Sequence, residues 1–283
     1  MPVRIGAHVS IAGSLDLAID RAVEIGAECI QIFGSAPQSW QSFIFPLEQV
    51  DKFQKKREEQ GISPVFLHAI YLINLASSNS RILGNSLTSL IQYLKFGRVI
   101  GAEGVIFHMG SHKGRGFEAV AGQLVEAVSQ VLSRTRESGR LIIENSAGAG
   151  GVVGASFREI GLVVKAVRDP RVAVCLDTAH AFESGYDLRT KKGLEQALDE
   201  FDREVGLEKL VAVHANDSRT SLGSHRDRHE NIGDGEIGLR GFKGIISHPD
   251  LRDLPFILET PGFGRHGVGR KNIETLRGLA GSG

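Results

Sequence analysis

The segments GVIFHMG (residues 104–110) and LIIEN (residues 141–145) are short apolar runs, and residues 117–137 between them have apolar side chains at helical spacing. This order predicts a strand, a helix and a second strand. A right-handed helical crossover returns the chain in the same direction, so the two strands are expected to be parallel neighbours. Both runs contain a side chain that can bind a metal at or near the end of the strand, namely His108 and Glu144.

The same alternation continues along the chain in both directions. We expect eight strands, at residues 3–10, 29–33, 64–69, 104–110, 141–145, 172–178, 210–216 and 255–260. Helical spacing occurs at residues 15–25, 47–60, 87–100, 117–137 and 194–205. Eight strand–helix units in 283 residues predict an α/β fold, the (β/α)8 TIM barrel. An open doubly wound sheet is disfavoured, because no GxGxxG turn follows the first strand.

Length and composition limit the class of protein. A chain of 283 residues has the size of one barrel, and it contains no linker or low-complexity tract, so we expect a single domain over residues 1–283. Lys+Arg and Asp+Glu number 33 each, so any attraction to nucleic acid must be local. No uncovered apolar helix demands a partner, and we expect a monomer.

Cysteine use and hydropathy indicate the compartment. Only Cys29 and Cys175 are present, which excludes a disulfide scaffold and a cysteine-based zinc ribbon and suits a reducing environment. No run approaches the ~18 apolar residues of a membrane span, and the first residues lack the order of a signal peptide. We expect a cytoplasmic protein without membrane contact. Cys175 precedes Asp177 by two positions, so we expect a buried thiol one layer below it.

Nearly every expected strand ends in a possible metal ligand. These side chains are His8, His68, His108, Glu144, Asp177, His180, His214 and Glu259, and the loop after the seventh strand adds Asp227 and His229. Parallel strands of a barrel end at one rim, the carboxyl-terminal mouth, so these residues are expected to converge. A single such residue is usually a hydrogen-bonding or capping group, and for His8 we expect a supporting, phosphate-contacting or plain surface role.

The other nine side chains predict a site with several metal ions. Five histidines and four carboxylates are too many for one tetrahedral zinc, and they would desolvate and repel one another without cations. Two or three ions would generate a hydroxide and stabilise the entering and leaving oxygens of a phosphoryl displacement. The share of histidine favours Zn²⁺, with Mn²⁺ as the alternative.

The chain resembles the endonuclease IV family of apurinic/apyrimidinic endonucleases. The resemblance is carried by GAHVSIAGSL, HAIYLINLAS, ENSAGAGG, CLDTAHAFESGYDLR, HANDSRTSLGSHRDRHENIGDGEIG and LETPG, which together extend over almost the whole chain. It implies a zinc-dependent barrel, a deoxyribonuclease IV of base-excision repair. Such an enzyme hydrolyses the phosphodiester 5′ to abasic sites in duplex DNA, leaves a 3′-hydroxyl and a 5′-deoxyribose phosphate, and also trims blocked 3′ ends.

The resemblance also implies a role for each ligand. Three Zn²⁺ ions would be bound, the first by His68, His108 and Glu144, the second by Glu144, Asp177, His214 and Glu259, and the third by His180, Asp227 and His229. A hydroxide bridging the first two ions would attack the phosphorus, and Glu144 would bridge these ions and position that nucleophile. Mn²⁺ remains the alternative at one site.

Three further residues match family positions that contact DNA. Tyr71 and Leu72 match a pair that the family inserts into the base stack, and ordinary loop packing is the alternative. Gln38 stands where the family often has an arginine that enters the minor groove. Ile70 and Met109 stand where proline is usual, which is expected to loosen two loops without changing a ligand.

Local charge is consistent with phosphate binding. Basic residues follow the strands that end at the mouth: Lys113, Arg115, Arg189, Lys191, Lys192, Arg219, Arg226, Arg228, Arg265, Arg270 and Lys271. We call this set the basic rim. Acidic side chains gather instead in residues 195–208. A basic rim with an acidic flank is the charge distribution that a DNA-backbone binder needs.

Two other functions are compatible with such a barrel. A metal-dependent sugar isomerase or epimerase would use similar ligands at the same mouth, but it needs neither the triad His180, Asp227 and His229 nor the pair Tyr71 and Leu72. A non-catalytic damage-binding protein would tolerate the loss of ligands, and none is lost here.

Overall fold

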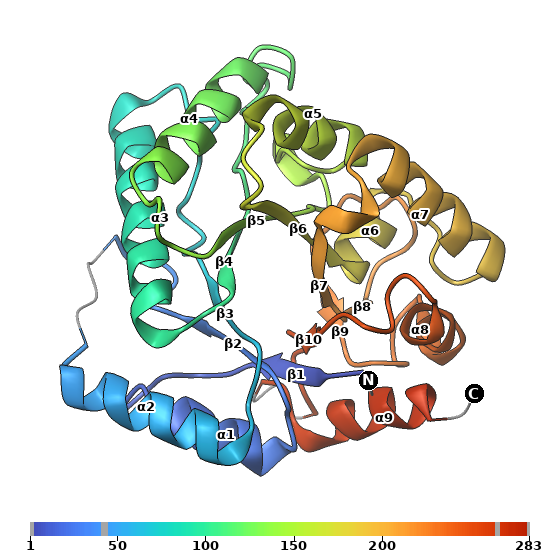
Figure 1. Cartoon of the computed structure of the whole chain (residues 1–283). Helices are drawn as coiled ribbons and strands as arrows, with labels where there is room; N and C mark the ends of the chain where they lie inside the picture. Colours follow the sequence, from blue (N-terminus) through green and yellow to red (C-terminus); the bar gives the residue numbers. More distant parts are fainter. Residues whose placement is uncertain (1–2, 41–44, 264–266, 282–283) are drawn as a thin grey trace.

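The computed structural model describes residues 3–40, 45–263 and 267–281, which form a closed barrel of eight parallel strands (Figure 1). The strands are β1 (Ile5–His8), β2 (Ile30–Phe33), β3 (Val65–His68), β4 (Gly104–Phe107), β5 (Arg140–Glu144), β6 (Val172–Asp177), β7 (Leu210–His214) and β10 (Phe256–Leu258). Each pairs in parallel with its neighbours along the chain, and β1 closes the barrel against β10. The predicted (β/α)8 fold is confirmed.

Helices surround the barrel (Figure 1). They are α1 (Leu17–Ile25), α2 (Leu47–Gln60), α3 (Ser80–Ile100), α4 (Ala121–Ser133), α5 (Phe157–Val167), α6 (Thr178–Ser184), α7 (Lys191–Glu204), α8 (Gly238–Ser247) and α9 (Arg270–Ala280), with short 3-10 turns η1 (Ala149–Gly151) and η2 (Leu207–Lys209). The loop after β7 contains a small antiparallel pair, β8 (Asp217–Ser218) and β9 (His229–Glu230). Within the three described ranges, no helix is both long and apolar enough to cross a membrane.

Four of the five predicted helices differ from their predicted bounds, α1 and α7 by up to three residues and α3 and α4 by more. The α3 helix begins at Ser80 rather than residue 87, because the Asn79 side chain caps it by accepting the backbone N–H groups of Arg81 and Ile82. The α4 helix ends at Ser133 rather than residue 137. Four helices, α5, α6, α8 and α9, lie outside the residue ranges that helical spacing had indicated.

The apolar core has two parts. The larger cluster contains residues from the barrel strands and from helices α1 to α9. The smaller cluster contains Cys29, Phe66, Ile106, Ile142, Ala173, Cys175, Ala212 and Ile257, all buried residues from β2 to β10 or directly beside these strands. We call this smaller set the inner cluster, because its side chains fill the inside of the barrel.

The inner cluster explains where the predicted ligands lie. Each of seven strands has a polar residue two positions after an inner-cluster residue: Gln31, His68, His108, Glu144, Asp177, His214 and Glu259. Side chains in a strand alternate between its two faces, so a residue and its second successor point the same way. These seven polar side chains therefore point into the mouth of the barrel, directly above the inner cluster.

Candidate metal centre

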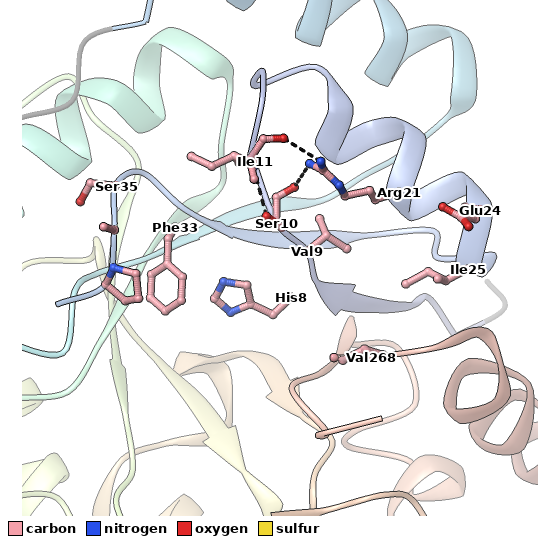
Figure 2. Close-up of a pocket in the computed structure, with 14 residues that line it drawn as sticks. His8, Val9, Ser10, Ile11, Arg21, Glu24, Ile25, Phe33, Ser35 and Val268 are labelled. Carbon is pink, nitrogen blue, oxygen red and sulfur yellow. Dashed lines mark hydrogen bonds between the residues drawn. The ribbon is translucent and has the colours of Figure 1, made fainter. Parts of the chain in front are cut away.

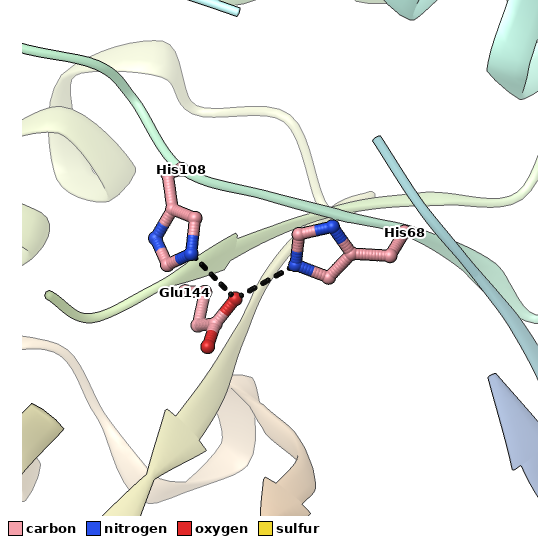
Figure 3. A group of neighbouring side chains, drawn as sticks. All are labelled: His68, His108 and Glu144. Atoms are coloured by element: carbon pink, nitrogen blue, oxygen red, sulfur yellow. Dashed lines mark hydrogen bonds and ion pairs between the residues drawn. The ribbon is translucent and has the colours of Figure 1, made fainter. Parts of the chain in front are cut away.

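The first group contains His68, His108 and Glu144 (Figure 3). Glu144 Oε2 lies 3.0 Å from His68 Nε2 and 3.2 Å from His108 Nε2. His68 Nδ1 lies 2.7 Å from the carbonyl oxygen of Ala69. A carbonyl only accepts, so Nδ1 carries a proton, and in the neutral ring Nε2 is the atom left to bind a metal. Burial opposes a charge on this ring, but the hydrogen bond and the charge of Glu144 raise the pKa of His68, so without metal a proton on Nε2 joins it to the carboxylate.

The second group contains Glu144, Asp177, His214 and Glu259. His214 Nδ1 lies 2.9 Å from Glu144 Oε1 and 3.4 Å from Glu259 Oε2. Asp177 Oδ2 is 3.9 Å from the same nitrogen, and β6 and β7 place Asp177 directly opposite His214. The two oxygens of Glu144 thus face different groups, which is the arrangement a bridging carboxylate needs.

The third group lies around His180 and His229. Their Nε2 atoms are 3.4 Å apart, and Asp227 Oδ1 is 3.4 Å from the first and 3.7 Å from the second. Ligands bound tetrahedrally to zinc at 2.0–2.1 Å are about 3.3 Å from one another. The predicted ligands His180, Asp227 and His229 therefore have a spacing that fits one ion. The cluster of mutually close donor atoms contains Asp177 in place of Asp227, with Asp177 Oδ2 3.6 Å from His229 Nε2, so Asp177 lies between the second and third groups.

Two asparagines that the sequence analysis missed orient Asp177. Asn216 donates from Nδ2 to Asp177 Oδ2 (2.6 Å), and its Oδ1 accepts the backbone N–H of Glu259 (2.8 Å). Asn145 accepts the backbone N–H of Asp177 (2.6 Å) and donates to its carbonyl oxygen (3.0 Å). Both are buried. Their positions in LIIEN and HANDS, next to ligands, are the signal that could have identified them.

Two buried carboxylates hold the loop that carries Asp227 and His229. Glu183 Oε1 accepts from the hydroxyl of Ser218 (2.8 Å) and from the backbone N–H of Arg228 (3.1 Å). Asp217 accepts backbone N–H groups from Gly233, Gly235 and Ile237 at 2.9, 3.1 and 2.9 Å. Desolvation raises the pKa of both carboxyl groups. These hydrogen bonds hold the loop in place without a bound metal.

The pKa shifts of the candidate ligands show that the buried carboxylates need positive charge beside them. Burial by itself would raise the pKa of Glu144, but the neighbouring imidazoles of His108 and His214 hold the pKa well below its usual range. Burial opposes a charge on His214, yet Glu259 and Glu144 raise the pKa of this histidine well above its usual value. Asp177 has the same effect on the pKa of His180. Without metal, protons on histidine take the place of cations beside the carboxylates. The donor set fits divalent ions.

Metal binding should therefore release protons. A histidine must be neutral to bind a metal, and His180 and His214 have raised pKa values in the metal-free geometry, so Zn²⁺ binding near pH 7 is expected to release protons. Zinc affinity should increase as pH rises. Calorimetric titration of the metal-free protein in buffers of different ionisation enthalpy measures the released protons. A binding enthalpy that is the same in every buffer would contradict this prediction.

The predicted supporting residues occupy the same mouth. His8 Nδ1 is 3.0 Å from Glu259 Oε1, so His8 contacts a candidate ligand and is absent from the three groups. It also lines a cavity of about 750 Å³ between the first loops of the barrel (Figure 2). Arg21 fixes the wall of this cavity by donating to the carbonyl oxygens of Ser10 and Ala12, both at 2.6 Å. Cys175 is buried, as predicted, and burial raises the pKa of its thiol to about 11.

The predicted DNA-contacting residues lie beside the mouth. Tyr71 is 62% exposed, whereas Leu72 is half-buried and packs against the larger core cluster. Both line a cavity of about 400 Å³ together with His108, His180 and Asp227. Gln38 is exposed, and the carbonyl oxygen of its neighbour Pro37 accepts the backbone N–H of Tyr71 (3.1 Å). The loops that carry Gln38 and Tyr71 are thus joined.

The basic rim is a surface feature. All of its members are exposed except Arg265, which lies outside the described residues. Arg189 is bound to Asp187 through two contacts of 2.8 and 3.0 Å, and it also lies over the ring of Phe182. The acidic residues 195–208 fall on α7, η2 and the turn between them.

Comparison with known proteins identifies the family. The profile of a family described as "Xylose isomerase-like TIM barrel" matches residues 19–279. A protein named "Probable endonuclease 4" from Halothermothrix orenii is 41% identical over 262 residues, which is 92% of this chain and 94% of that protein. A second protein of that name, from Persephonella marina, is 37% identical and covers 98% of this chain and 97% of its own length. The chain belongs to the endonuclease IV family.

Solved structures agree with this membership. The crystal structure of endonuclease IV from Thermus thermophilus has a TM-score of 0.86 and 35% identity, with 98% of both chains covered. A D-tagatose 3-epimerase-like protein has a TM-score of 0.75 but only 15% identity, with 98% of this chain and 97% of that chain covered. The second likeness shows the fold alone. The resemblance of this chain to endonuclease IV is therefore confirmed at the level of the family.

Proposed function

We propose that this member of the endonuclease IV family is a metal-dependent endodeoxyribonuclease of base-excision repair that hydrolyses the phosphodiester 5′ to abasic sites in duplex DNA. One observation carries the proposal: three candidate metal groups share the mouth of the barrel with the exposed ring of Tyr71. Neither a polyol nor a ketose substrate needs an aromatic wedge beside its metal ligands. An abasic nucleotide, which has no base to unstack, is the substrate such a wedge would extrude at least cost.

The chain's own residues provide the positions that the reaction needs. Divalent ions held by the nine ligands would supply a hydroxide nucleophile and stabilise charge on the leaving 3′-oxygen. Glu144 directs Oε2 toward His68 and Oε1 toward His214, so it is placed to link the first and second groups. Tyr71 and Leu72 would enter the base stack. The basic rim would hold the bent phosphate backbone.

Several finer features belong to the same proposal. We infer three Zn²⁺ ions, since the five histidines among the nine ligands favour zinc over the oxygen-preferring ions, with Mn²⁺ as the alternative at one site. The products would be a 3′-hydroxyl and a 5′-deoxyribose phosphate, and the same site would trim blocked 3′ ends. The protein would act as a monomer in the cytoplasm.

A nicking assay tests the function. A duplex with one tetrahydrofuran abasic-site analogue should be cut once, on the 5′ side, and a polymerase should extend the resulting 3′ end. Removal of the metal with a chelator should stop cleavage, and added Zn²⁺ should restore it. The same duplex without the analogue is the control. Binding without cutting would indicate a damage-binding protein, and interconversion of ketohexoses without nicking would indicate an epimerase.

Gln38 is expected to limit the affinity for DNA. Replacing this exposed side chain with arginine should tighten binding to abasic duplex DNA and steepen its salt dependence by up to about one unit in the slope of log K against log salt. Fluorescence anisotropy at a series of salt concentrations measures both quantities. Gln60→Arg, at the end of α2, is a control with the same charge change away from this loop. Equal slopes for wild type and Gln38→Arg would contradict the predicted DNA contact.

A further inference from the structure

Gln31 is a buried polar side chain that the sequence analysis did not single out. It lies in β2 within the apolar run CIQIF at residues 29–33, and its exposed fraction is 0%. It follows Cys29 of the inner cluster by two positions, so its carboxamide points into the mouth. A buried amide costs free energy unless its polar atoms are bonded, so its partners matter.

The partners of Gln31 are two candidate metal ligands and His8. Its Oε1 lies 2.8 Å from His214 Nε2. Its Nε2 donates to Glu259 Oε1 at 2.6 Å and lies 2.9 Å from His8 Nδ1. The carboxamide therefore contacts His214 and Glu259 from the side opposite the other ligands of the second group.

These contacts determine which atoms remain for a metal. A carboxamide oxygen only accepts, so His214 Nε2 must carry a proton. In the neutral ring, Nδ1 then has the free lone pair, and Nδ1 is the atom that lies 2.9 Å from Glu144 Oε1. In the same way Gln31 occupies Glu259 Oε1, which leaves Oε2 directed at His214 Nδ1 at 3.4 Å.

We propose that Gln31 is a positioning residue of the second metal group, which sets the tautomer of His214 and the orientation of the Glu259 carboxylate. This inference rests on the proposed metal centre. Outer hydrogen bonds of this kind fix the ring and raise the basicity of a ligand, and their loss typically costs about 10- to 100-fold in metal affinity. Since the first and third groups do not contact Gln31, the effect should be confined to one ion.

The test measures metal binding rather than cleavage. Gln31→Leu removes all three polar contacts at similar volume, and Gln31→Met is a second variant of similar length in case the first does not fold. Competition with a chromogenic chelator gives the Zn²⁺ affinities, and the absorption spectrum of the Co²⁺-loaded protein reports ligand geometry. Gln123→Leu is the matched control, because within the described residues Gln123 on α4 donates to the carbonyl oxygens of Leu75 and Ser77 and to no candidate metal ligand.

The expected result is a loss of about 10- to 100-fold in affinity for one ion, with a changed cobalt spectrum, while the other ions bind as in wild type. Gln123→Leu should change neither the Zn²⁺ affinities nor the cobalt spectrum. Zinc affinities within twofold of wild type and an unchanged cobalt spectrum in both Gln31 variants would overturn the inference. Failure of the wild-type protein to nick abasic DNA would instead refute the proposed function, and the metal titrations would still decide the role of Gln31.

Discussion

Replacing Glu144 with glutamine should reduce the rate of nicking at an abasic site by at least about a thousandfold while the damaged duplex still binds. Metal-ion stabilisation of a phosphoryl transition state contributes several kcal/mol, and each ~1.4 kcal/mol is a factor of ten in rate. Glu144 is buried and faces His68, His108, His180 and His214. The amide removes the negative charge that two groups share, whereas Tyr71 and the basic rim remain to bind DNA.

Two measurements isolate this effect. Single-turnover nicking with saturating enzyme separates the chemical step from DNA binding, which gel-shift or anisotropy titration measures independently. The matched control is Glu195→Gln on α7, where the carboxylate is exposed and contacts only Lys191 among the ion pairs of the described residues. An unchanged turnover in Glu144→Gln would refute the linking role of this carboxylate.

Gly6→Ala should destabilise the barrel by at least about 3 kcal/mol, at the upper end of the range for overpacked cores. A Cβ at this position in β1 would lie 1.8 Å from the carbonyl oxygen of Cys29 and 2.6 Å from its Sγ. The oxygen is a backbone atom of the residue directly before β2, so no side-chain rotation can relieve the contact. The strands β1 and β2 would have to separate, next to His8 and Gln31.

Chemical denaturation of the metal-free protein measures this loss without a contribution from bound ions. The control is Gly84→Ala in α3, where the added Cβ meets nothing within 4 Å. In that variant the free energy of unfolding is expected to increase by about 0.5–1 kcal/mol, because alanine loses less backbone entropy than glycine when the helix forms. A Gly6→Ala protein as stable as wild type would show that the two strands can move apart at little cost.

The strands and most of the candidate site could be predicted without coordinates. Apolar runs with a polar residue at or near the end, such as VFLH at β3 and LIIE within β5, repeat once per strand–helix unit. Helix bounds were less predictable. The start of α3 depends on the cap at Asn79, and the predicted helix at residues 87–100 followed apolar spacing alone.

The hydrogen-bonding partners of the ligands could not be predicted from local pattern. Gln31 and His214 are 183 positions apart, and their contact depends on closure of the barrel between β1 and β10. Asp177 was assigned to the second group, and the structure also places it 3.6 Å from His229 of the third. Such proximity depends on strand register and loop path, which no spacing along the chain encodes.

The set of side chains at the mouth follows from the order of residues alone, because alternation in a strand and the common direction of eight strands place each of them at one rim. The grouping and the orientation of these side chains depend on the folded barrel. Gln31, Asn145 and Asn216 gain their roles from atoms of other strands that approach within 3.0 Å. A hydrogen bond requires that distance and direction, and both exist only after the strands have closed.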